Sequence, residues 1–326
     1  MAKIISRKNI YYFLEELKKK YQVYAPVKKK NEYIFQSIMD VPADNISLEY
    51  PTTILPPKKF FFPPYETIFE FEKEKIKIPK IDEKTVLFGL HLYDIHGLLI
   101  LDTVFSHPIN DYYYQKRRQN TIVIGISTPA ESPAFYEAFG LDVHVGYDLF
   151  LNEVPEGFLA TAESKIGEKF LKLPFFKETY WREGITQKYP DKLFSNKELI
   201  KKAVLQKNHK IWKHLTEICF GCGICSYVCP VCYCFEMEDK INSDLCSGCR
   251  IRRWDACFLP DFSKVAGNYN FRPKLKDRIY HWYYHKFIQM PEEIGKIGCV
   301  GCGRCINYCP AKINFRKILE ELIKNL

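Results

Sequence analysis

The sequence predicts an α+β protein, with an α/β domain at residues 1–195 followed by a mainly helical domain at residues 196–326. Three observations support this division. Strand patterns alternate with helix patterns in the first part, which is typical of an α/β sheet. All thirteen cysteines lie between Cys219 and Cys309. Residues 277–288, inside that cysteine-containing region, are rich in helical and aromatic character.

The first domain is expected to begin with a helix and two strands. Residues 9–21 carry apolar side chains at helical spacing, with charged residues on the opposite face. Residues 22–27 and 33–38 have strand patterns. Prolines interrupt the next stretch, which contains the sequence Lys58-Lys59-Phe60-Phe61-Phe62. We expect these phenylalanines to pack inside the protein rather than to form an exposed docking patch.

From residue 85 onward, apolar strands are expected to alternate with helices. The predicted strands span residues 85–90, 121–127, 142–149 and 157–161. The predicted helices span residues 94–105, 132–139 and 197–217, and the last of these leads into the first cysteine run. The sequence has no Gly-x-Gly-x-x-Gly motif after a strand and no P-loop motif. We therefore expect the chain to bind no nucleotide itself.

Two similar cysteine runs dominate the second domain. They read Cys219-Phe-Gly-Cys222-Gly-Ile-Cys225-Ser-Tyr-Val-Cys229-Pro230 and Cys299-Val-Gly-Cys302-Gly-Arg-Cys305-Ile-Asn-Tyr-Cys309-Pro310. This is the pattern of two-cluster ferredoxins, in which three cysteines of a run hold one [4Fe–4S] cluster and the fourth holds the other. The pattern predicts one cluster on Cys219, Cys222, Cys225 and Cys309. It predicts a second cluster on Cys299, Cys302, Cys305 and Cys229.

Disulfides and zinc explain these runs less well. A disulfide framework is typical of short secreted chains, whereas this chain is long and begins without an apolar signal segment. Zinc sites usually use paired two-cysteine knuckles. A reducing cytoplasm is therefore the expected location. The runs are separated by an insertion at residues 230–298, which is longer than a compact bacterial ferredoxin needs. We accordingly expect an α-helical-ferredoxin-type domain that binds two [4Fe–4S] clusters.

The insertion holds five further cysteines: Cys232, Cys234, Cys246, Cys249 and Cys257. Four of them could complete a third iron–sulfur cluster, and Cys246 with Cys249 has the spacing of a zinc knuckle. Free cysteine is also among the most buried residue types, so reduced thiols packed in the core are the alternative. The sequence leaves a third cluster, a zinc site and buried thiols open.

Charge and hydropathy exclude other classes of protein. The chain has a formal charge of +9, but no finger, helix-turn-helix or RNA-binding signature accompanies it, so we expect no nucleic acid partner. Its most apolar region, residues 85–105, is interrupted by His91, Asp94, His96 and Asp102, so we expect no membrane span.

Two histidine groups are weak candidates for ligands. His91 and His96 follow a predicted strand together with Asp94, and we expect a buried turn there. His281 and His285 lie one helical turn apart, without the glutamate of a zinc protease motif, and we expect them to pack at the edge of the core. Arg252 and Arg253 could tune a cluster, or they could be solvated or pair with Asp255 and Asp261.

Several longer segments resemble one protein family. They span residues 225–235, 252–257, 265–272 and 299–305, together with residues 24–27, 56–62 and 100–105 in the first domain. On these segments the chain resembles the iron–sulfur β subunit of soluble [NiFe] sulfhydrogenases and the A subunit of anaerobic sulfite reductases, nearly from end to end. The segments of the first domain resemble the sulfhydrogenase branch more closely.

The resemblance implies an electron-transfer subunit without a catalytic site of its own. Its partners would be a reductase subunit that binds FAD and NAD(P)H, and a catalytic [NiFe] hydrogenase or sulfite reductase subunit. Two alternatives belong to other classes: a self-sufficient reductase with a substrate-binding cluster in the insertion, and a scaffold subunit whose clusters serve structure. Members of the family also carry cysteines at the equivalents of Tyr93, Thr128, Ala134 and Tyr136. Their absence here implies that this chain lacks any cluster that those cysteines hold.

Overall fold

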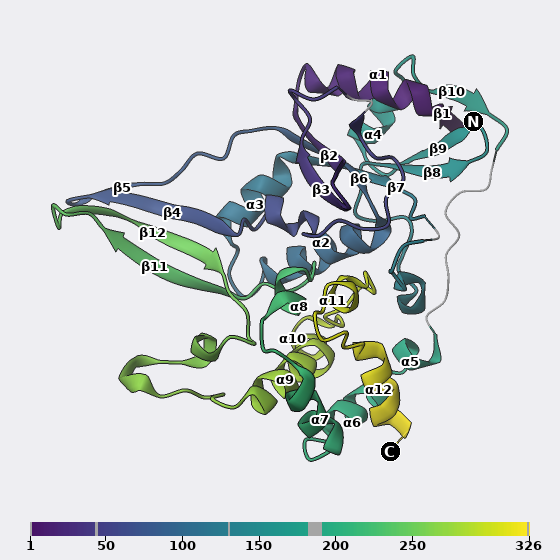
Figure 1. Cartoon of the computed structure of the whole chain (residues 1–326). Coiled ribbons are helices and arrows are strands. Elements are labelled where there is room, and N and C mark those ends of the chain that lie inside the picture. Colours follow the sequence, from purple (N-terminus) through teal and green to yellow (C-terminus); the bar gives the residue numbers. More distant parts are fainter. Residues whose placement is uncertain (1, 43–44, 130, 182–190, 325) are drawn as a thin grey trace.

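A computed structural model describes the chain except for residues 1, 43–44, 130, 182–190 and 325 (Figure 1). The N-terminal part forms a mixed eight-stranded sheet with the order β10-β1-β9-β8-β7-β6-β2-β3. The four strands β2, β6, β7 and β8 are mutually parallel, and the remaining neighbours pair antiparallel. The strands are β1 (Ala2–Ile5), β2 (Gln22–Lys29), β3 (Glu32–Ser37), β6 (Thr85–Leu90), β7 (Thr121–Ile126), β8 (Leu149–Val154), β9 (Gly157–Ala162) and β10 (Lys177–Thr179).

Helices cover this sheet, and one of them also faces the cysteine-rich part of the chain. They are α1 (Arg7–Lys18), α2 (Leu92–Val104), α3 (Tyr112–Gln119) and α4 (Lys165–Phe170). Helix α1 begins where the Ser6 hydroxyl accepts a hydrogen bond from the backbone N–H of Asn9. Helix α2 is buried along most of its length. A Cβ atom at Gly97 of α2 would lie 2.8 Å from Cβ of Pro230, so glycine allows the first cysteine run to approach this helix.

The segment between β7 and β8 differs from the sequence prediction. The predicted helix at 132–139 is reduced to the 3₁₀ turn η3 (Tyr136–Phe139), and the described residues 131–148 contain no strand before β8 begins at Leu149. The backbone hydrogen bonds of this segment go elsewhere: the N–H of Phe135 donates to the carbonyl of Gly301 in the second cysteine run. Gly140 and Gly146 also have positive φ values of 58° and 88°, which regular helix and strand do not accommodate. Tertiary contact with the cysteine loop therefore replaces local structure.

The predicted helix at 197–217 is interrupted. It forms α6 (Lys197–Leu205) and α7 (Lys210–Ile218), which follow the short α5 (Lys192–Ser195). The Trp212 side chain donates a hydrogen bond from Nε1 to the carbonyl of Gln206 at 2.8 Å, and the His209 side chain accepts from the N–H of Ile211 as the cap of α7. These side-chain contacts stabilise a turn where the hydrophobic pattern alone predicts continuous helix.

A second, four-stranded antiparallel sheet has the order β11-β12-β4-β5 and projects as an arm (Figure 1). It joins two distant parts of the chain. Strands β4 (Tyr65–Glu72) and β5 (Lys75–Lys77) come from the first part, after the 3₁₀ turn η2 (Pro57–Phe60). Strands β11 (Phe235–Ile241) and β12 (Ser247–Trp254) come from the insertion. We call these four strands the arm.

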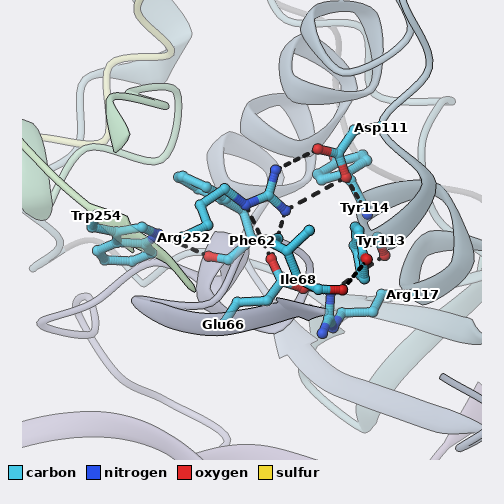
Figure 2. Close-up of polar contacts among 9 residues, drawn as sticks. All are labelled: Phe62, Glu66, Ile68, Asp111, Tyr113, Tyr114, Arg117, Arg252 and Trp254. Carbon is cyan, nitrogen blue, oxygen red and sulfur yellow. Dashed lines mark hydrogen bonds and ion pairs between the residues drawn. The ribbon is translucent and has the colours of Figure 1, made fainter. Parts of the chain in front are cut away.

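Buried charges fix the base of the arm (Figure 2). Arg252 of β12 donates to Glu66 of β4 at 2.6 Å and also pairs with Asp111, the N-cap of α3. The Trp254 indole N–H donates to the carbonyl of Phe62 at 2.9 Å. Phe62 is fully buried, as expected for the phenylalanine run. The partners predicted for Arg252 and Arg253 were wrong, because strand pairing brings Glu66 to Arg252 and Glu236 to Arg253.

The cysteine runs lie among short helices that pack beside α6 and α7 (Figure 1). These are α8 (Ile224–Tyr227), α9 (Leu275–Tyr284), the π-helix η6 (His285–Gln289), α10 (Met290–Ile294), α11 (Arg304–Asn307) and α12 (Phe315–Lys324), with the 3₁₀ turns η4 (Pro260–Ser263) and η5 (Ala266–Asn268) between β12 and α9. The helix predicted around residues 277–288 is confirmed. Of the helices in the described ranges, none is long and apolar enough to cross a bilayer.

Candidate metal centres

The two cysteine loops share one backbone conformation. Gly221 and Gly223 have φ values of 65° and 74°, and Gly301 and Gly303 have φ values of 66° and 72°. Residues other than glycine rarely adopt this left-handed backbone conformation. The second glycine of each loop is the N-cap of a short helix, α8 or α11. A Cβ atom at Gly303 would lie only 2.2 Å from the carbonyl oxygen of Pro133, so this loop also needs glycine for close contact.

The first cavity, which we call cavity 1, contains all four cysteines predicted for the first cluster. Cys219, Cys222, Cys225 and Cys309 line it, together with Cys305. The remaining wall is apolar and is formed by Leu215, Phe220, Ile224, Phe258, Ile279, Trp282, Tyr283, Ala311, Ile313 and Phe315, with Gly223 and Pro310. The cavity lies at the protein surface, since Cys222 is exposed and 71% of the Phe220 residue is accessible to solvent.

The second cavity, cavity 2, contains all four cysteines predicted for the second cluster. Cys229, Cys299, Cys302 and Cys305 line it, together with Lys286. Cys229 and Cys302 are buried, so this cavity lies deeper than cavity 1. The side chains of Cys305, Trp282 and Phe315 line both cavities. The two cavities are therefore neighbours separated by a shared wall.

Backbone and side-chain donors point at the sulfur atoms. The N–H groups of Gly221 and Gly301 donate to Cys219 and Cys299 at 3.4 and 3.5 Å, one in each loop. The Lys286 ammonium donates to Sγ of Cys229 at 3.2 Å and to the carbonyl of Gly298 at 2.8 Å. Donors of this kind stabilise negative charge on cysteine ligands.

Burial controls the ionisation of these groups. It raises the pKa of Cys299 to about 12 and of Cys302 to about 11, so the free thiols keep their protons at neutral pH. Burial alone would lower the pKa of Lys286, but thiolates including Cys229 raise it well above its usual value. No carboxylate within the described ranges pairs with Lys286, which is 2% exposed. The site thus favours a group that brings negative charge to sulfur.

A second observation also fits iron–sulfur clusters. The indole Nε1 of Trp282 is buried and has no acceptor among the described residues, although Trp282 lines both cavities. A buried donor without a partner costs free energy, on the order of 1–3 kcal/mol. Sulfide or thiolate sulfur of a [4Fe–4S] cluster would supply an acceptor at this wall. The cysteine sets, Lys286 and Trp282 therefore suit such clusters.

The loop of the second run is anchored to α2 by a buried ion pair. Arg304 lies between Cys302 and Cys305, and its guanidinium donates to both carboxylate oxygens of Asp94 at 2.5 and 2.8 Å. Both side chains are completely buried. Arg304 also donates to the carbonyl of Thr53 at 2.7 Å. The buried turn expected at Asp94 is the first turn of α2.

The five insertion cysteines fall into two separate groups. Cys232 and Cys257 are buried and Cys234 is half-buried, and a hydrogen bond from Cys257 lowers the pKa of Cys234 to about 7. Cys249 lies in the arm opposite Lys240, five residue pairs beyond the pair at the base. At ~3.4 Å per residue this is roughly 17 Å, so one site cannot hold all five. In the described part of the chain, no group of three or more His, Cys, Asp or Glu side chains converges to hold a single metal ion.

Three of the positions at which the resemblance implies cysteines in other family members, Tyr93, Ala134 and Tyr136, lie close together. The rings of Tyr93 and Tyr136 have centroids 5.8 Å apart. Both tyrosines and Ala134 belong to one apolar cluster with Cys229 and Cys302. Aromatic side chains thus fill this position in the present chain.

The histidine candidates are packed side chains. His91 is fully buried between the carbonyls of Tyr50 and Ile126, and burial lowers its pKa to about 4. His281 and His285 stack with ring centroids 5.9 Å apart, and burial lowers the pKa of His281 to about 4. Sequence reasoning missed Lys286 and Trp282 as site residues. Both lie in a run of aromatic and basic residues whose pattern predicts only helix.

Comparisons with known proteins agree with the cysteine geometry. Residues 218–313 match the model of the 4Fe-4S dicluster domain. The chain is 38% identical to the sulfhydrogenase 2 subunit beta of Pyrococcus furiosus over an alignment of 329 positions, which covers 96% of each chain. No solved structure matches. Identity at this level over nearly the whole length, in addition to the dicluster match, establishes that the chain belongs to the family of sulfhydrogenase β subunits, the iron–sulfur subunits of hydrogenases.

Proposed function

We propose that the chain relays electrons between a partner subunit that binds FAD and NAD(P)H and a catalytic subunit of the [NiFe] hydrogenase or sulfite reductase type. The observation that carries this proposal is the pair of neighbouring cavities, each lined by one predicted set of four cysteines. When bound there, [4Fe–4S] clusters supply one-electron oxidation and reduction. The chain itself holds the two clusters next to each other.

The exposed side of cavity 1 is the proposed contact with one redox partner. Cys222 and Phe220 are exposed there, and the rest of the wall excludes water with apolar side chains. Electrons exchanged at this side reach cavity 2 across the wall of Cys305, Trp282 and Phe315. The chain performs no substrate chemistry in this proposal. None of the thirteen cysteines, all of which lie in the described ranges, forms a disulfide, which fits a complex in the reducing cytoplasm.

The first experiment tests the crossed ligand sets. The intact chain is purified anaerobically, and iron and acid-labile sulfide are measured with the paramagnetic resonance spectrum of the reduced state. Two clusters predict about eight irons per chain. Cys309→Ser should remove the same signal as Cys222→Ser, and Cys229→Ser should remove the same signal as Cys302→Ser. The double variant Cys246→Ser, Cys249→Ser is the matched control and should keep both signals.

Two results would contradict the proposal. If Cys309→Ser removed the same signal as Cys302→Ser, each run would hold its own cluster and the crossed assignment would fail. If the isolated chain reduced sulfite with reduced methyl viologen, it would be a self-sufficient reductase rather than a relay. Reversible reduction of both clusters, with no turnover of sulfite or hydrogen by the isolated chain, is the expected result.

A further inference from the structure

One buried positive charge distinguishes the two cavities. Lys286 lies in the π-helix η6, 2% exposed, and its ammonium contacts Sγ of Cys229 at 3.2 Å. Its remaining contacts are the carbonyl of Gly298 at 2.8 Å and the ring of Trp282, whose centroid is 5.1 Å away. π-Helical turns are rare and often occur at functional sites. Here the turn carries an ammonium into cavity 2.

The wall of cavity 1 contains no charged side chain, since none of the residues that line it is Asp, Glu, Lys or Arg. Its cysteines receive backbone donors only: Gly221 donates to Cys219 and Ile313 donates to Cys309, both at 3.4 Å. Cavity 2 has the equivalent backbone donor from Gly301 to Cys299 at 3.5 Å. The backbone contributions are thus similar. The buried Arg278 lies near Cys219 of cavity 1, but its guanidinium donates to the backbone carbonyls of Phe258, Arg272 and Pro273 rather than to sulfur. The main difference between the cavities is therefore the direct contact between Lys286 and Cys229.

The other buried cations near the runs are differently placed. Arg304 is compensated by both carboxylate oxygens of Asp94. Lys58 is as buried as Lys286, but its ammonium donates to the backbone carbonyls of Cys232 at 2.7 Å and Ser226 at 3.4 Å. Lys286 alone among these three cations contacts a sulfur atom that the proposed function assigns to a cluster.

We propose that Lys286 raises the reduction potential of the cluster in cavity 2 above that of the cluster in cavity 1. Reduction adds one negative charge to a cluster, and a cation at a ligand sulfur stabilises that charge more than it stabilises the oxidised state. One electron then leaves the cluster in cavity 1, which is oxidised from the 1+ to the 2+ state. The same electron reduces the cluster in cavity 2 from 2+ to 1+, and Lys286 keeps its proton throughout.

This inference rests on the proposed function and adds the direction of electron transfer between the two clusters. An electron that enters at the exposed cavity 1 comes to rest in the buried cavity 2, beside Lys286. Lys286 acts on the cluster through its contact with Cys229 and touches no substrate.

The test is a redox titration of the intact chain with dithionite, monitored by electron paramagnetic resonance (EPR) spectroscopy. Cys229→Ser and Cys222→Ser identify which signal belongs to which cavity. In the unmodified chain, the cavity 2 signal should appear at the higher potential. In Lys286→Met that signal should move to lower potential, and it should move further than the cavity 1 signal, because Lys286 contacts Cys229 directly and no sulfur of cavity 1. Lys286→Arg should restore most of the potential, and Lys58→Met, the matched control, should move it less.

Each result decides the inference separately from the proposed function. About eight irons in Lys286→Met with both potentials unchanged would overturn the role of Lys286 and leave the relay intact. A higher potential for the cavity 1 cluster in the unmodified chain would overturn the proposed order without any variant of Lys286. If Lys286→Met does not retain its iron, Lys286→Gln provides the same test with a neutral donor. If Cys309→Ser and Cys222→Ser removed different signals, or Cys229→Ser and Cys302→Ser did so, the result would instead contradict the proposed function.

Discussion

Arg304 and Asp94 form a two-pronged ion pair that is completely buried between the second cysteine loop and helix α2. The two residues are 210 positions apart in the sequence. Arg304 lies within the ligand loop, and Asp94 lies in the first turn of a helix that covers the large sheet. The pair therefore couples the position of the cluster loop to the cysteine-free part of the chain.

Replacing Arg304 with Met should destabilise the protein strongly. The change leaves the Asp94 carboxylate buried without a cation, which typically costs about 3–5 kcal/mol. Anaerobic urea unfolding, followed by intrinsic fluorescence, measures the loss. The control is Arg250→Met, because Arg250 pairs with Asp239 through two similar hydrogen bonds on the exposed arm. That variant should unfold at nearly the urea concentration of the unmodified chain, and equal losses in both variants would contradict the importance of burial.

Replacing Gly303 with Ala should remove the cluster proposed for cavity 2. Its φ of 72° disfavours alanine, and the added Cβ would lie 2.2 Å from the carbonyl of Pro133. Gly295→Ala provides the control, since Gly295 has a similar φ of 71° but no atom within 4 Å of the added Cβ. Iron analysis should give about four irons per chain for Gly303→Ala and about eight for Gly295→Ala. Full iron content in both variants would show that the loop can move away from Pro133.

Replacing Trp282 with Phe should have opposite effects on the iron-free and iron-loaded chains. In the iron-free chain, the change removes a buried N–H that has no acceptor in the described ranges, so the free energy of unfolding should stay equal or rise. In the loaded chain, the same change removes a donor to cluster sulfur and should destabilise the protein. Urea unfolding of both forms measures the difference. An equal change in both forms would mean that Trp282 does not donate to a cluster.

His91 should make the protein less stable in mild acid. Burial lowers its pKa from 6.5 to about 4 in the folded chain, so the folded state binds fewer protons than the unfolded state between these values. The stabilisation is complete above pH 6.5 and is lost as the pH falls towards 4. Between pH 7 and 5 the loss from this residue should be about 2 kcal/mol. The free energy of unfolding is measured for the unmodified chain and for His91→Gln at both pH values. Because glutamine does not titrate, the variant should lose about 2 kcal/mol less stability between pH 7 and pH 5 than the unmodified chain.

The cysteines that line each cavity could be predicted from the sequence, because the two-cluster ferredoxin pattern groups three cysteines of one run with the fourth cysteine of the other. Cys219, Cys222 and Cys225 are held by one short loop, and the repeated pattern at Cys299 identifies its counterpart. The apolar pattern likewise predicted β6, β7 and α2 close to their observed bounds. These elements depend mainly on residues close to them in the chain.

The contacts that distinguish the two cavities could not be predicted in this way. Lys286 reaches Cys229 across 57 positions, and Arg304 reaches Asp94 across 210. A buried lysine and a solvated one look alike in a sequence, since only tertiary packing removes water from the ammonium. The same reason explains the lost helix at residues 132–139, where a hydrogen bond to Gly301 competes with helical bonds.

The arm also constrains the order in which the chain can fold as it is synthesised. Strand β4 leaves the ribosome early, but its partner β12 ends at Trp254, so one edge of β4 stays unpaired while the intervening residues emerge. Exposed strand edges are prone to pair with other chains. A nascent chain that ends before β12 would therefore expose an aggregation-prone strand edge. Soluble expression of the protein in cells should depend on chaperones that shield β4 until β12 has been synthesised.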